Sequence, residues 1–76
     1  MDRDFVVSQF TRYVHGFDQG EEGVRLKYAH SLRVSSLCEQ IAGSLGLSQD
    51  EVDLAWLIGV LHDIGRFEQM REYHTF

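Results

Sequence analysis

The stretch LAWLIGVLHDIGR, residues 54–66, decides the fold that we predict for this chain. Its first eight residues, Leu54 to Leu61, carry no charge, and the stretch then changes abruptly to His62 and Asp63. Because the segment is apolar on almost every side, we expect it to form a buried central helix over residues 49–64. An imidazole and a carboxylate at the end of such a helix lose water and need partners, and a metal ion satisfies both.

Local signals mark both ends of this helix. Ser48 and Glu51 have the spacing of a capping box, in which each side chain accepts a hydrogen bond from the other residue's backbone N–H. Gly46, just upstream, is typical of the position after a helix, because glycine adopts the left-handed backbone conformation found there. We expect Gly65 to end the central helix.

Hydrophobic residues at helical spacing predict two earlier helices, over residues 4–17 and 21–45. The apolar stripe of the second consists of Leu26, Val34, Leu37, Ile41 and Leu45. His30 falls on this stripe and is therefore expected to project among the core residues. His15, in the last turn of the first helix, is interpreted as a surface cap that suits the negative end of the helix dipole.

The fold class predicted from these patterns is all-α. Residues 66–76 are expected to add one or two helical turns to the three helices described above. The chain of 76 residues is long enough for one small helical bundle, so we expect a single domain over residues 1–76.

Composition excludes several classes of protein. The formal net charge of −5 opposes a nucleic-acid-binding surface, which is normally basic. The longest apolar run is far shorter than the roughly 20 residues that span a bilayer, and residues 1–4 do not begin a secretory leader. Cys38 is the single cysteine and cannot form an internal disulfide. We therefore expect a cytoplasmic protein that binds neither nucleic acid nor membranes.

The polar residues and their flanking sequence resemble the HD domain, a helical family of metal-dependent phosphohydrolases. The resemblance rests on HSLRV at residues 30–34 and on LIGVLHDIGRFEQ at residues 57–69, and it covers about residues 20–76. It implies that His30, His62 and Asp63 bind a divalent metal ion. Mn, Fe, Co, Ni, Zn and Mg all remain open as its identity.

The resemblance also implies hydrolysis of a small, nucleotide-like phosphate ester. Asp63 would be the catalytic residue, both a metal ligand and a hydrogen-bond acceptor for the attacking water. Arg66 and Arg33 are predicted to bind the substrate phosphate. The alternative for Arg66 is a surface cation near a helix C-terminus. The alternative for Arg33 is a partner of an acid such as Glu39 or Asp53.

One part of the family's pattern is missing. The family's last metal ligand is an Asp downstream of the His-Asp doublet, and this sequence contains no Asp after Asp63. We therefore expect the chain to be the N-terminal portion of an HD domain, with a reading frame that continues past Phe76. Without that carboxylate, the short chain is expected to bind metal weakly and to catalyse little. His74 is interpreted as a bystander rather than a further ligand.

Two alternatives remain. The first is a catalytically silent helical module that keeps HD sequence and forms a homo-oligomer through exposed apolar surface. The second is a DNA-binding helix-turn-helix over residues 41–52. The charge pattern opposes the second alternative, because the would-be recognition helix carries Asp50, Glu51 and Asp53 and no basic residue.

Overall fold

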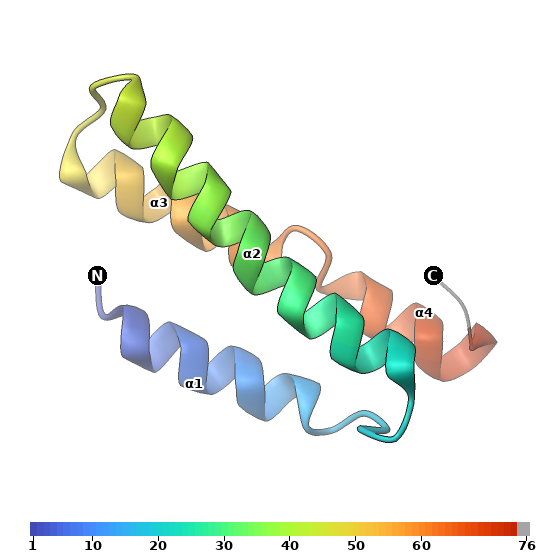
Figure 1. The fold of residues 1–76 in the computed structure, drawn as a ribbon. Helices are drawn as coiled ribbons and strands as arrows, with labels where there is room; N and C mark the ends of the chain where they lie inside the picture. Colours follow the sequence, from blue (N-terminus) through green and yellow to red (C-terminus); the bar gives the residue numbers. More distant parts are fainter. Residues whose placement is uncertain (75–76) are drawn as a thin grey trace.

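The computed structural model describes residues 1–74 and confirms the all-α prediction. Its helices are α1 (Arg3–Val14), α2 (Glu22–Ser44), α3 (Gln49–Leu61) and α4 (Gly65–Tyr73) (Figure 1). Residues 1–74 contain no strand, and none of their helices has the length and apolar character needed to cross a membrane. Thr75 and Phe76, at the end of the predicted tail, lie outside the described residues.

The helix boundaries follow the predicted signals, with two corrections. The capping box of Ser48 and Glu51 is present, and Gly46 has the left-handed φ of 75°. However, α1 ends at Val14, with His15 as its C-cap, so it is shorter than predicted. In addition, α3 ends at Leu61, and Gly65 begins α4 instead of ending α3. The turn between them is closed by the Ile64 N–H, which donates to the Leu61 carbonyl at 3.1 Å.

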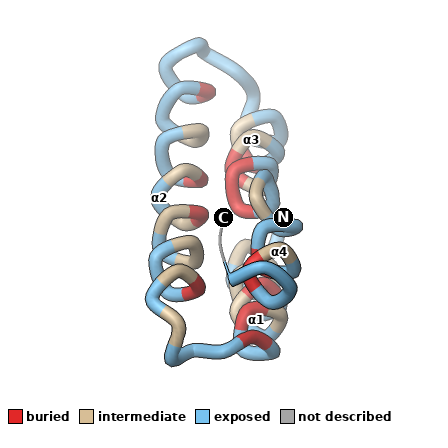
Figure 2. The backbone as a smooth tube through the Cα atoms, turned by 90° about the vertical axis from the view of Figure 1, so that its right-hand side faces the viewer, coloured by how far each residue is buried: buried red, intermediate tan, exposed pale blue. Residues whose placement is uncertain are grey.

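The helices form two layers, with α2 on one side and the other three helices on the other (Figure 2). Helix α2 makes most of its contacts with α3 and further contacts with α4. The shape measures 40 × 21 × 15 Å, and its thickness accommodates only two layers, because packed helix axes lie about 8–10 Å apart. The outer side of α2 is therefore not covered by another described helix.

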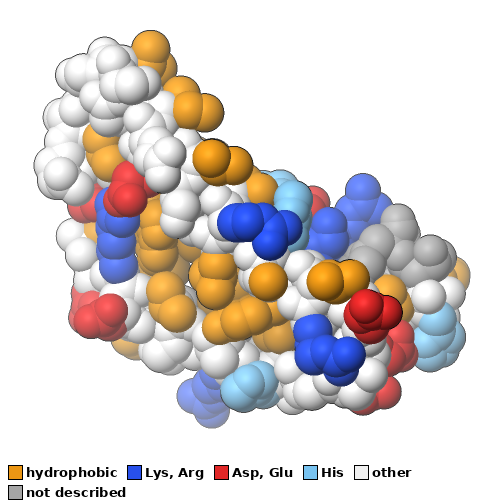
Figure 3. Space-filling model, viewed as in Figure 1, with side chains coloured by type: hydrophobic (Ala, Val, Ile, Leu, Met, Phe, Trp, Pro, Cys, Tyr) orange, Lys and Arg blue, Asp and Glu red, His pale blue; other side chains and the backbone are white. Residues whose placement is uncertain are grey.

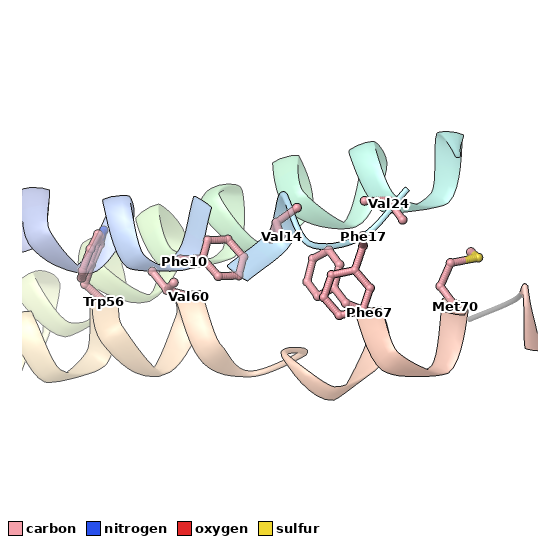
Figure 4. Packing of buried hydrophobic residues seen from close by; sticks show 8 residues of the cluster. All are labelled: Phe10, Val14, Phe17, Val24, Trp56, Val60, Phe67 and Met70. Atoms are coloured by element: carbon pink, nitrogen blue, oxygen red, sulfur yellow. The ribbon is translucent and has the colours of Figure 1, made fainter. Parts of the chain in front are cut away.

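Aromatic residues from α1, from the turn that follows α1 and from α4 form the centre of the core (Figure 4). Phe67 of α4 is fully buried, and its ring lies 5.7 to 6.2 Å from three other rings. These rings belong to Phe10, Tyr13 and Phe17. Because Phe67 follows the His62–Asp63 turn by only four residues, this packing anchors the chain just after the turn.

Small residues allow α2 and α3 to approach closely. A Cβ on Gly59 would lie 2.6 Å from the Cα of Ser35, which is closer than real Cβ atoms approach other atoms. Ser31 and Ser35 are buried on the same face of α2. The close approach of the two long helices is therefore made at a glycine and a serine, Gly59 and Ser35.

The apolar stripe predicted to line the core side of α2 lies mainly on its outer side, so that prediction is wrong. The exposed fractions of its leucine and isoleucine residues run from 55 to 70%. The fully buried positions of α2 are Val24, Ser31, Ser35 and Ala42, which face the other helices (Figure 2). Close helix packing favours small residues at the contact, which explains why the large side chains are left outside.

Helix α3 is buried along one face only, whereas the sequence predicted a central helix buried on almost every side. Its buried residues are Asp53, Trp56, Gly59 and Val60. Leu54 and Ile58, on the opposite face, are more than half exposed. Because the described helices form only two layers, one apolar face of α3 is left without a neighbouring helix.

Arg3 connects α1 to both long helices. Its Nη2 lies 2.7 Å from Asp53 Oδ1, and its Nη1 pairs with Glu39. The guanidinium also stacks over the Trp56 ring. The hydrogen bond from Arg3 is the main reason that the pKa of Asp53 is lowered. Both acids that were considered as partners of Arg33 are thus paired with Arg3.

Candidate metal centre

The three predicted metal ligands converge at the C-terminal end of α3. His30 comes from α2, His62 is the C-cap of α3, and Asp63 follows in the turn before α4. One ligand atom from each residue lies within 4.8 Å of the ligand atoms of the other two. The cluster is thus assembled from two helices and the turn.

The cluster lies at the surface rather than in the core, which corrects the predicted inward positions of His30 and His62. The side chains of His30, His62 and Asp63 are 40, 30 and 20% exposed. His62 follows Leu54 and Ile58 along the outer face of α3, so it shares their access to solvent. A small ligand can reach these side chains without any opening of the helical packing.

The distances fit a single divalent ion. Asp63 Oδ2 lies 3.0 Å from His62 Nε2 and 3.8 Å from His30 Nε2. Nitrogen and carboxylate ligands bind such ions at about 2.0–2.2 Å, so two ligands of one ion lie roughly 3–4 Å apart. Two imidazoles and one carboxylate also form a donor set typical of divalent transition metals.

A backbone contact orients the His62 ring. Its Nδ1 lies 2.6 Å from the carbonyl oxygen of Gly59. Because a carbonyl oxygen can only accept, Nδ1 carries the proton and donates it. The lone pair of a neutral ring is then on Nε2, the atom nearest to Asp63 and therefore the one available to a metal.

Lys27 belongs to the cluster and was missed in the sequence. Its Nζ lies 3.0 Å from Asp63 Oδ2, and this hydrogen bond is the main reason that the pKa of Asp63 is lowered. Partial burial acts in the opposite direction, and the nearby His62 and Arg66 lower the pKa further. Asp63 is therefore held as a carboxylate. One signal was available, because Lys27 precedes His30 by three residues and shares its helix face.

The two predicted phosphate-binding arginines both lie near the cluster. Arg66 Nε lies 3.9 Å from Asp63 Oδ1, and its Nη1 donates to Gln69 at 2.9 Å. Arg33 lines a shallow hollow of about 380 Å³ together with Gly23, Leu26, Lys27 and His30. Histidine and basic side chains can be seen next to each other on this face (Figure 3).

His74 lies apart from the cluster, as expected for a bystander. Its Nδ1 is 3.1 Å from Glu21 Oε1, and it is not among the residues that converge on Asp63. No acid lines the hollow beside His30 within residues 1–74. The charged side chains that line this hollow are therefore the cations Lys27 and Arg33.

Comparison with known proteins shows which family the sequence around this cluster matches. A family model described as HD domain matches residues 28–75, which is more than half of the chain and includes all three clustered ligands. The comparisons with curated proteins and with solved structures gave no match.

Proposed function

The chain belongs to the HD domain family, and we propose that it provides a divalent metal centre for the hydrolysis of a small, nucleotide-like phosphate ester. The observation that carries this proposal is the convergence of His30, His62 and Asp63 within 4.8 Å of one another. HD domains generally bind divalent metals, and this cluster has the donor atoms and spacing that such an ion needs.

Each ligand has a defined role in this proposal. His30 and His62 would hold the ion through Nε2, and Asp63 would hold it through Oδ2, the oxygen that faces both rings. The bound ion would acidify a water molecule and neutralise charge that develops on the phosphoryl group. The second oxygen of Asp63 would accept a hydrogen bond from that water, which makes Asp63 the proposed catalytic residue.

The donor set also narrows the choice of metal. Imidazole ligands favour Mn²⁺, Fe²⁺, Co²⁺, Ni²⁺ or Zn²⁺ over Mg²⁺, which prefers oxygen ligands. Arg66 and Arg33 are proposed to bind phosphate oxygens, because both lie beside the cluster and guanidinium groups form paired hydrogen bonds with phosphate.

Metal content and phosphatase activity test this proposal. We expect the purified chain to bind one Co²⁺ or Mn²⁺ ion per chain in equilibrium dialysis. Because the family's downstream Asp is absent, we expect the loaded chain to release phosphate only slowly from some member of a panel of phosphate esters. His62→Ala should lose the ion. His15→Ala, which changes an exposed histidine at the end of α1, should retain it. If the wild-type chain retains no metal, the proposal is wrong.

A second candidate function is supported by an exposed apolar face. We call this surface the apolar face and define it as Leu37, Ile41, Leu45, Leu54 and Ile58. Each of these side chains is more than half exposed, and a row of hydrophobic side chains follows one edge of α2 (Figure 3). Monomeric proteins rarely expose contiguous apolar patches larger than a few hundred Å². The face therefore favours a helical module that pairs with a second copy of itself.

A further inference from the structure

Lys27 and the proposed metal ion need the same oxygen atom. The Nζ of Lys27 lies 3.0 Å from Asp63 Oδ2, which is also the oxygen that faces Nε2 of His62 and of His30. An ion held by Asp63 would lie about 2.0–2.2 Å from that oxygen. The ammonium group and a divalent cation repel each other, so metal binding weakens the contact between Lys27 and this oxygen.

The hollow beside His30 offers another position for the ammonium group. Lys27 and Arg33 both line it, and within residues 1–74 no acid does. Lysine has a flexible four-carbon stem and three N–H donors, so its charged end can move while its backbone stays fixed in α2. Two cations next to a metal centre favour an anion, and phosphate oxygens can interact with the metal and the ammonium group at once.

We propose that Lys27 is a phosphate-binding residue that pairs with Asp63 in the metal-free chain and moves to the ligand's phosphate once Asp63 coordinates a metal ion. This inference rests on the proposed function, because it requires the metal centre formed by His30, His62 and Asp63. The inference adds Lys27 to the site as a residue whose partner changes when the metal binds. In the metal-free chain Lys27 compensates the charge of Asp63, and in the loaded chain it contributes a positive charge to phosphate binding.

Chemical labelling can follow Lys27 directly, because it is the only lysine in the sequence. Acetylation of its Nζ is measured by mass spectrometry of peptides, separately from the N-terminal amine. We expect Co²⁺ to raise the labelling rate several-fold, because Lys27 leaves Asp63. Inorganic phosphate added to the Co²⁺-loaded chain should lower the rate again, whereas phosphate alone should not. A rate that Co²⁺ leaves unchanged would overturn the proposal.

A substitution gives a second, independent test. In Lys27→Met, calorimetric titration should show a Co²⁺ affinity equal to or higher than that of wild type, because a competing cation has been removed. The affinity of the Co²⁺-loaded chain for inorganic phosphate should fall about tenfold or more. Arg25→Met is the matched control, because Arg25 is a cation of the same helix that donates to the Gln19 carbonyl. It should leave both affinities unchanged.

The outcomes separate this inference from the proposed function. If the wild-type chain binds no Co²⁺, the metal centre and this inference both fail. If Lys27→Met binds Co²⁺ normally and binds phosphate as tightly as wild type, only the role of Lys27 fails. If Lys27→Met loses Co²⁺ binding as well, Lys27 supports the structure of the centre and is not displaced from it, which also overturns the inference.

Discussion

Gly59 lies so close to Ser35 that a Cβ on the glycine would fall 2.6 Å from the serine Cα. This contact occurs five residues after His30 on α2 and three residues before His62 on α3. It fixes the separation of the two helices near the point where both imidazoles lie, with ring centroids 5.5 Å apart. The packing of small residues between the helices therefore positions the candidate metal centre.

Adding one methyl group at this contact should destabilise the protein. Gly59→Ala gains up to about 1 kcal/mol in helix propensity, but the atoms it meets belong to the α2 backbone and cannot move easily. Overpacking of this kind costs about 1–3 kcal/mol, so we expect a net loss of stability, measured as a lower urea midpoint.

Gly43→Ala is the control for this substitution. Gly43 is also helical, and a Cβ there would meet no atom within 4 Å. It should leave the urea midpoint unchanged or raise it, by up to about 1 kcal/mol in free energy of unfolding. A Gly59→Ala protein as stable as Gly43→Ala would show that the two helices can separate at no cost.

Neutralising Asp63 should abolish metal binding while leaving the fold intact. Asp63→Asn keeps the shape of the side chain but removes the charge that holds the ion. Loss of residues that only support metal ligands lowers affinity about 10- to 100-fold, so loss of this ligand should cost at least about 100-fold. The measurement is a Co²⁺ titration followed by visible absorption.

Asp50→Asn is the matched control for Asp63→Asn, because Asp50 is an exposed acid in the first turn of α3, at the other end of that helix. It should bind Co²⁺ as the wild type does. Equal affinity of Asp63→Asn and wild type would show that the cluster does not bind metal through this carboxylate.

The pair of Arg3 and Asp53 should make stability depend on pH. The pKa of Asp53 is lowered in the folded chain, chiefly by the hydrogen bond from Arg3. A lowered folded pKa means that the stabilisation is fully present above the unfolded value of about 3.9 and is lost as the pH falls through the folded value. Asp53→Asn should therefore melt below wild type at pH 7, and the gap should narrow below about pH 4.

The control for this pH dependence is Asp4→Asn, which changes an exposed acid of α1. Its melting temperature should differ little from that of wild type at pH 7. A gap between Asp53→Asn and wild type that stays constant from neutral to acidic pH would mean that the Arg3 contact does not depend on the charge of Asp53.

Local sequence signals predicted the features that depend on local chemistry. Ser48 and Glu51 form their capping box because both partners lie within one turn, and Gly46 has the backbone conformation expected after a helix. The family resemblance brought together His30, His62 and Asp63, which the structure places in one cluster. These features could be predicted without knowing how the helices cross.

Features that depend on how the helices pack were harder to predict from the sequence. The apolar stripe of α2 was predicted to be its core face, whereas the buried residues of α2 include Ser31 and Ser35, and Ser35 packs against Gly59 of α3. Periodicity identifies an apolar face, but it does not show whether another element covers that face. Lys27 was missed for a related reason, because its contact depends on where the turn after α3 places Asp63.

The apolar face should make the protein self-associate. Exposed leucine and isoleucine side chains on α2 and α3 gain about 25 cal/mol for each Å² of apolar surface that a second copy removes from water. We expect sedimentation velocity to show a concentration-dependent dimer of the wild-type chain. Ile41→Glu places a charge within the face and should shift the protein to a monomer without unfolding it, because Ile41 is 60% exposed.

Phe5→Glu separates this effect from a general loss of surface hydrophobicity. Phe5 is also 60% exposed, but it lies on α1, outside the apolar face. If the apolar face is the interface, Phe5→Glu should sediment as the wild type does, and only Ile41→Glu should dissociate. A wild-type chain that remains a folded monomer at high concentration would contradict self-association. In that case the metal centre would be the only functional proposal left for this chain.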